Sequence, residues 1–233
     1  MSAPNHAVIV LASGLSQRLG QPKQLLNKND EPLISHMLKL ALTTKPKVIS
    51  VVIPKDNLLI ADVIARWVTK EPKIKTVTNP NPEIGMGHSL YLGIESLTQL
   101  ANSNDSRSDL IERVLIMGVD QVLLDLAHLC QLLDGNSTVV ASGYGSWRLL
   151  DNDKSEKGLK ERPINNIVGL PLVIDSALLK QWQTTLGGDK GLRHLIRALP
   201  PDQIKTINNQ QLSYDIDTPA QLNYAKAQDW IGD

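Results

Sequence analysis

Residues 7–23 read AVIVLASGLSQRLGQPK, an apolar run that passes directly into a loop with little apolar side chain to pack. The apolar run predicts a buried strand of a parallel sheet, because such strands are apolar on both faces. In the loop, Gly14 and Gly20 allow main-chain N–H groups to approach an anion, and Arg18 and Lys23 add positive charge. A strand that ends in such a loop is typical of α/β proteins that hold phosphate groups.

Two well-known phosphate motifs do not fit this loop. The dinucleotide fingerprint G-x-G-x-x-G is absent because Gly14 and Gly20 are too far apart, and the P-loop is absent because Gln24 follows Lys23 where Ser or Thr is required. Taken alone, the loop therefore fits a phosphate-binding site and a flexible connection about equally well.

Short apolar runs alternate with amphipathic stretches along the rest of the chain. We expect strands at 48–53, 74–77, 114–117, 137–141, 166–174 and 204–207, and helices at 32–43, 58–68, 88–100, 176–186, 190–199 and from 218 onward. This alternation predicts a three-layer α/β fold, an open and mostly parallel sheet with helices on both faces. Pro171 should confine its strand to an edge or a bulge of the sheet.

The length of the chain favours a single domain over residues 1–233. The formal net charge is +0, from 24 basic and 24 acidic residues, which argues against a nucleic-acid-binding surface. No apolar segment approaches the ~20 residues that span a bilayer, and the N-terminus lacks the features of a signal peptide. Residues 151–162 are dense in mixed charge and predict a solvated loop insertion.

The chain has a single cysteine, Cys130, so no intramolecular disulfide can form. This favours a reducing compartment, and we expect the protein in the cytoplasm. Cys130 lies in a predicted helix among leucines, where a buried structural thiol is expected rather than a nucleophile. The histidines show no metal-ligand spacing, which argues against a zinc site.

Ligands of open parallel sheets bind beyond the carboxyl ends of the strands. The loop 12–23, the turn at Asn79 and the side chain of Asp120 each follow a predicted strand, so we expect them at one edge. A carboxylate near a phosphate loop suits Mg²⁺, although a strand-end aspartate can also simply stabilise a turn. Asp217 has a comparable second interpretation, as part of the start of the last helix; Asp215, two residues earlier, should face the same side.

The segment Gly85–Ser89 opens a predicted helix. Free N–H groups at a helix start, together with the helix dipole, attract an anion or a nucleotide base. Ser89 could act there as a helix N-cap, a role that is compatible with binding. His88 has no acid nearby in the sequence to orient it, so a turn histidine is expected rather than a general base.

The pattern Leu-Ala-Ser-Gly-x-x-x-Arg-x-Gly-x-Pro-Lys at 11–23 resembles the signature of the MobA-like nucleotidyltransferases, and within them most closely the molybdenum cofactor cytidylyltransferases. Further landmarks of the family follow in order: Gly85–Leu90 with Gly93, Asp120-Gln121, Gly169-Leu170-Pro171, Gly188–Gly191 and Asp215–Pro219. The resemblance spans the chain from about Val8 to Ala225, and its first and last motifs are specific in combination.

The resemblance implies roles for individual residues. The implied catalytic residues are Arg18, Lys23, Asp120 and Asp217, and the two aspartates match the family's Mg²⁺ carboxylates. The implied nucleotide contacts are Leu11, Ala12, Ser13, Gly14, Arg18, Lys23, Asn79, Gly85 and Ser89. The implied contacts to the second substrate are Gly169, Pro171, Asp189 and Lys190. The implied reaction transfers CMP from CTP to the terminal phosphate of molybdopterin cofactor and releases pyrophosphate, with a recipient molybdoenzyme as a possible partner.

Three alternatives remain open at this point. Ala12-Ser13 resembles the cytidine type, whereas guanylyltransferases usually have Gly there, so a GTP-dependent enzyme is the first alternative. A sugar- or polyol-phosphate nucleotidyltransferase is less favoured, because residues 188–191 resemble the cofactor enzymes. Val122 stands where the family usually has Pro, and this departure, with the insertion at 151–162, leaves open a non-catalytic cofactor carrier or chaperone. Retention of both aspartates favours the enzyme.

Overall fold

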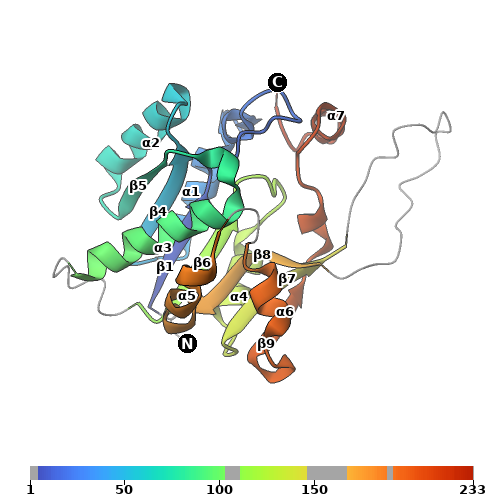
Figure 1. Ribbon diagram of the computed structural model, residues 1–233. Coiled ribbons are helices and arrows are strands. Elements are labelled where there is room, and N and C mark those ends of the chain that lie inside the picture. The colour runs from blue at the N-terminus through green and yellow to red at the C-terminus, as the bar shows by residue number, and fades with distance from the viewer. Residues whose placement is uncertain (1–4, 103–110, 146–166, 188–190, 233) are drawn as a thin grey trace.

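The computed structural model describes residues 5–102, 111–145, 167–187 and 191–232, and the predicted insertion at 151–162 lies outside them. Its main sheet has seven strands in the order β5-β4-β1-β6-β8-β7-β9 (Figure 1). The bounds are β1 His6–Leu11, β4 Val48–Pro54, β5 Ile74–Asn79, β6 Arg113–Gly118, β7 Val139–Tyr144, β8 Ile167–Asp175 and β9 Ile204–Asn208. A small antiparallel pair is formed by β2 Asn27–Lys28 and β3 Glu31–Pro32.

The predicted mostly parallel sheet is confirmed. Strands β5, β4, β1 and β6 run parallel, with Ala7 of β1 paired to Val48 on one side and to Val114 on the other. Strand β8 is antiparallel to both of its neighbours, β6 and β7, and β9 joins β7 in parallel. The carboxyl ends of four strands therefore meet at one edge of the sheet, which is where the loop after β1 lies.

Helices cover both faces of the sheet, as expected (Figure 1). The helices are α1 Leu33–Thr43, α2 Leu58–Lys70, α3 Met86–Asn102, α4 Leu126–Leu133, α5 Ser176–Trp182, α6 Arg193–Ala198 and α7 Pro219–Ala227. Successive side chains of a strand point to opposite faces, so Val8 and Val10 of β1 pack with α1, α2, α4 and α7. Ala7 and Ile9 pack on the other face with α3, α5 and α6. No helix within the described ranges is long and apolar enough to cross a membrane.

Side-chain caps explain where several helices begin. Asn57 accepts a hydrogen bond from the Ile60 N–H at the start of α2, and Asp125 caps α4 in the same way. Thr218 accepts from the Gln221 N–H, and Pro219 occupies the first turn of α7. Since Thr218 is the cap, Asp217 is left free to serve another purpose.

The structure decides between the two placements expected for the strand that contains Pro171. Strand β8 lies inside the sheet, so the edge position is wrong, whereas the bulge is confirmed. Leu172 pairs with Ala141 and Gly169 pairs with Ser142, and this shift in register leaves Pro171 unpaired. Because proline has no N–H to donate, the bulge removes the need for a ladder bond there. The carbonyl of Pro171 accepts a hydrogen bond from the Ser142 hydroxyl at 2.6 Å.

The predicted burial of Cys130 is wrong, although the helix itself is confirmed. Cys130 is exposed, and the buried face of α4 is formed by its neighbours His128, Leu129, Leu132 and Leu133. In this short amphipathic helix, the two positions that follow Leu129 face away from the sheet. The prediction was wrong because the leucines next to Cys130 in the sequence suggested an apolar surrounding.

Gly93 brings α3 close to the sheet. A Cβ atom at this position would lie 2.8 Å from Cγ2 of Ile9 and 3.3 Å from Cγ2 of Val52. We expect Gly93→Ala to lower the free energy of unfolding by about 1–3 kcal/mol, because the packing strain exceeds the helix propensity that alanine adds. Urea denaturation measures the change, and Gly187→Ala is a control, with no atom of the described residues within 4 Å of the new Cβ. Unchanged stability of Gly93→Ala would contradict this close packing.

Candidate active site

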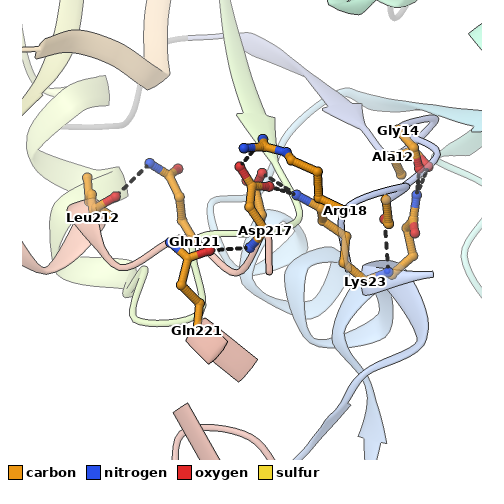
Figure 2. Close-up of polar contacts among 11 residues, drawn as sticks. Ala12, Gly14, Arg18, Lys23, Gln121, Leu212, Asp217 and Gln221 are labelled. Atoms are coloured by element: carbon orange, nitrogen blue, oxygen red, sulfur yellow. Dashed lines mark hydrogen bonds and ion pairs between the residues drawn. The ribbon is translucent and has the colours of Figure 1, made fainter. Parts of the chain in front are cut away.

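The loop after β1 is held in shape by a buried glutamine. The Gln24 side-chain amide donates hydrogen bonds to the carbonyls of Ala12, at 2.7 Å, and Gly14, at 2.9 Å (Figure 2). The Lys23 N–H donates to the Ser16 hydroxyl at 3.2 Å, which ties the far end of the loop to its middle. No role was assigned to Gln24 from the sequence. Its position directly after Lys23, at the end of the loop, was the one feature that could have indicated a role there.

Two cations of this loop meet carboxylates from two other elements. Lys23 Nζ lies 3.1 Å from Asp120 Oδ2 and 2.6 Å from Asp217 Oδ1. Arg18 Nη2 lies 2.7 Å from Asp217 Oδ2 (Figure 2). Asp120 follows β6 and Asp217 precedes α7, so the topology brings together all four residues that sequence reasoning proposed as catalytic.

The electrostatic balance keeps these groups charged. Burial by itself would lower the pKa of Lys23, but the carboxylates of Asp120 and Asp217 outweigh it and raise that pKa well above its usual value. For Asp217, burial opposes ionisation, yet the hydrogen bonds and charges of Lys23 and Arg18 prevail and lower its pKa. Both shifts stabilise the charged forms, so the ion pair between Lys23 and Asp217 persists at neutral pH.

Asp215 is the third carboxylate of the centre. It forms an isolated antiparallel bridge with Gln121, which places it beside Asp120. Burial, followed by the charges of Asp120 and Asp217, raises the pKa of Asp215 from 3.8 to about 6. This proximity agrees with the expectation that Asp215 and Asp217 lie on one side of their extended segment.

We expect Asp215→Asn to stabilise the protein at neutral pH. The raised pKa means that the folded protein binds a proton which the unfolded chain releases, so stability falls as pH rises from about 4 to about 6. Asparagine removes this cost, and the variant should be more stable by about 1–3 kcal/mol at neutral pH and equal to wild type near pH 4. Urea titrations at both pH values measure the difference, with the exposed Asp202→Asn as control. An equal gain at both pH values would refute the electrostatic origin.

A buried polar network connects the loop with β5 and α3. The hydroxyls of Ser13 and Ser89 are 2.6 Å apart, and Asn79 Nδ2 donates to both. All three residues are buried. Helix α3 begins at Met86, so Ser89 lies in its first turn and is not the N-cap. The network brings three predicted nucleotide contacts together beside the loop.

The remaining predicted site residues are placed as follows. Leu11 ends β1, Ala12 is fully buried and Gly14 is exposed. Gly85 has φ 115°, a backbone conformation that favours glycine, directly before α3. Gly169 lines a cavity beside the carboxylates, whereas Pro171 is buried and is not among the residues that line it. Asp189 and Lys190 lie outside the described residues.

Gln121 joins two walls of that cavity. Its side-chain amide donates to the carbonyl of Leu170, on β8, at 2.7 Å and to the carbonyl of Leu212 at 3.4 Å. Figure 2 shows Gln121 reaching toward Leu212 while Asp217 faces the two loop cations. We infer that Gln121 positions the cavity wall next to Asp120, a role that sequence reasoning did not assign.

The order of the sheet, its helix layers and the loop at its carboxyl edge define a Rossmann-like fold of the nucleotidyltransferase type. Residues 8–204 match the MobA-like NTP transferase domain, and the chain therefore belongs to this family of nucleotidyltransferases. No curated protein sequence matches the chain.

Solved structures share the fold at low sequence identity. The chain is similar to 4-diphosphocytidyl-2C-methyl-D-erythritol synthase from Anaerococcus prevotii, with a TM-score of 0.67, 13% identity and coverage of 97% of this chain and 96% of that one. It is similar to a putative glucose-1-phosphate thymidylyltransferase from Bacillus anthracis, with a TM-score of 0.66, 14% identity and coverage of 97% and 95%. It is also similar to Rv0371c from Mycobacterium tuberculosis, described in complex with manganese, with a TM-score of 0.59, 18% identity and coverage of 94% and 97%.

Proposed function

We propose that the protein transfers CMP from CTP to the terminal phosphate of molybdopterin cofactor and releases pyrophosphate. The observation that carries this proposal is the meeting of Arg18 and Lys23 with Asp120 and Asp217 at the mouth of the loop 12–23. Cations there suit a triphosphate, and the adjoining cavity offers room for a second substrate. The choice of CTP and of the cofactor rests on the resemblance of residues 11–23 to the cytidylyltransferase signature.

Asp120 and Asp217 fit a divalent cation. Their oxygens converge on the Lys23 ammonium, which stands in for a cation between them. Mg²⁺ needs only one or two carboxylates when phosphate oxygens and water complete its shell. This agrees with the described part of the chain, where no group of three or more His, Cys, Asp or Glu is arranged to hold a metal. Mg²⁺ held there would supply positive charge between the α-phosphate and the attacking phosphate.

The protein's own residues bind and orient two anions. An oxygen of the acceptor phosphate forms a bond to the α-phosphorus of CTP, and the bond from that phosphorus to the bridging oxygen breaks as pyrophosphate leaves. Phosphate is already an anionic nucleophile, so positioning and charge stabilisation matter more than a general base. Arg18, Lys23 and the loop N–H groups hold the leaving pyrophosphate, and one such preorganised contact is worth on the order of 10²–10³ in rate.

We expect a preference for CTP over GTP. Ala12 and Ser13 are buried and add β-carbons where the guanine-specific pattern has glycine, which leaves less room for a purine. Packing alone discriminates by about 1–3 kcal/mol, so GTP should be a poor but detectable substrate. Competition between labelled CTP and GTP measures the ratio. Preferential incorporation of GTP would refute the cytidylyl assignment and favour the guanylyltransferase alternative.

The proposal is tested by pyrophosphate release from each of the four nucleotides with Mg²⁺, measured without an acceptor, with molybdopterin cofactor, and with a sugar phosphate or polyol phosphate. Cofactor binding is measured in parallel. We expect release with CTP that depends on the cofactor. Release that requires a sugar phosphate or a polyol phosphate would identify a different acceptor. Binding of the cofactor without any release would favour the non-catalytic carrier.

A further inference from the structure

A cavity of about 730 Å³ opens beside Asp120 and Asp215. Its lining combines β8 with the region of α6 and is largely apolar, with Leu170, Leu172, Leu192 and Ile196 among its residues. Its polar lining residues include Asp120, Asp215, Tyr144 and two arginines. A cavity of this size can enclose a small molecule with a sizeable apolar or aromatic body.

Two arginines line the same cavity on α6. Arg193 and Arg197 are four residues apart, so they lie on one face of the helix. Among the residues that the structure describes, neither forms an ion pair with a carboxylate. Two guanidinium groups beside apolar walls, with no carboxylate partner in the described part of the chain, form an anion-binding surface, since guanidinium matches phosphate geometry with two parallel N–H donors.

Tyr144 lines the cavity together with Arg193, Asp120 and Asp215. Burial, followed by the charge of Asp120, raises the pKa of Tyr144 to about 12, and Arg193 acts on the same hydroxyl in the opposite direction. Arg18 and Lys23 of the loop pair with Asp120 and Asp217, and the α6 arginines line the same cavity as Asp120 and Asp215.

We propose that Arg193 and Arg197 bind the phosphate of the acceptor, while a flat heteroaromatic body of that acceptor packs against β8 and the apolar residues of α6. This inference rests on the proposed nucleotidyl transfer and names the class of its second substrate. An anionic nucleophile would otherwise meet the repulsion of Asp120 and Asp215, and the arginines offset it. The apolar walls disfavour a sugar or polyol, whose hydroxyls would lose water without gaining partners.

Calorimetric binding tests the inference directly. The probes are molybdopterin cofactor, glucose 1-phosphate and CTP, and the proteins are wild type, Arg193→Gln, Arg197→Gln and the double variant. The exposed Arg66→Gln, on α2, is the matched control. Each single change at α6 should weaken cofactor binding by at least about 10-fold, and the double change by about 100-fold. CTP binding should stay within about two-fold in every variant, because the arginines act on the other substrate.

Three results would overturn the inference. The first is a double variant that binds the cofactor as tightly as the wild-type protein does. The second is a wild-type protein that binds glucose 1-phosphate as tightly as the cofactor. The third is a wild-type protein that does not bind the cofactor at all. The proposed function fails separately. If cofactor binding depends on the arginines but no pyrophosphate is released with CTP, the assignment of the acceptor site is supported and the proposed CMP transfer is refuted. If transfer occurs and the Michaelis constant for cofactor is unchanged in all three α6 variants, only the acceptor assignment fails.

Discussion

Replacing Asp217 or Asp120 by asparagine should reduce kcat at least about 100-fold, because each change removes one charge from the pair that would hold Mg²⁺ between two phosphates. Asparagine keeps the shape of the side chain. For Asp217 it also weakens the two ion pairs, of 2.6 and 2.7 Å, that position Lys23 and Arg18. Steady-state pyrophosphate release measures the loss.

The matched control for these variants is Asp62→Asn, an exposed aspartate on α2. Circular dichroism and urea denaturation should show that both site variants remain folded, because the two carboxylates lie at the open edge of the sheet rather than in either core. Turnover within a few-fold of wild type in either site variant would refute the assignment of these two aspartates to the metal.

Lys23→Met should lower both turnover and stability. The side chain of Lys23 is 11% exposed and is the only group that bridges Asp120 and Asp217 within the described ranges. Among the described residues, its loss leaves Asp120 without an ion pair and Asp217 with only the exposed Arg18, which should cost about 2 kcal/mol of unfolding free energy for this partly buried cluster. Loss of one triphosphate contact should slow turnover on the order of 10²-fold.

A metal titration separates these two effects. Added Mg²⁺ should restore more stability to Lys23→Met than it adds to wild type, since the variant lacks the cation that already stands between the carboxylates. The controls are Lys73→Met, an exposed lysine before β5, and Cys130→Ala, on the exposed side of α4. Equal losses of turnover in all three variants would indicate general destabilisation and would argue against the phosphate-binding loop.

Much of this fold follows from local sequence patterns. The apolar runs of β1, β4 and β6 were predictable because strands buried on both faces must be apolar throughout. The convergence of the loop, Asn79 and Asp120 followed from the geometry of parallel strands alone. What the sequence could not show was the interior position of β8, because a bulge that accommodates Pro171 depends on the register of two strands.

The charged residues of the site could be predicted from the sequence, whereas the residues that hold the surrounding main chain in place could not. Arg18, Lys23, Asp120 and Asp217 were identifiable from one motif near each end of the chain and one aspartate after a strand. The roles of Gln24 and Gln121 were not, since each acts through main-chain carbonyls that only the tertiary structure brings within reach. Arg193 and Arg197 likewise gain meaning only because α6 borders the cavity beside the carboxylates.

The most direct test of the account is the identity of the product formed by purified protein from CTP labelled at the α-phosphate, Mg²⁺ and molybdopterin cofactor. Mass spectrometry of the isolated cofactor should show one added cytidine monophosphate, with the label retained and one pyrophosphate released per product. The label should stay in CTP when Asp217→Asn replaces the wild-type protein. The account would be contradicted if the wild-type protein left the cofactor unlabelled, either because it transfers CMP to a different phosphate or because it transfers no CMP.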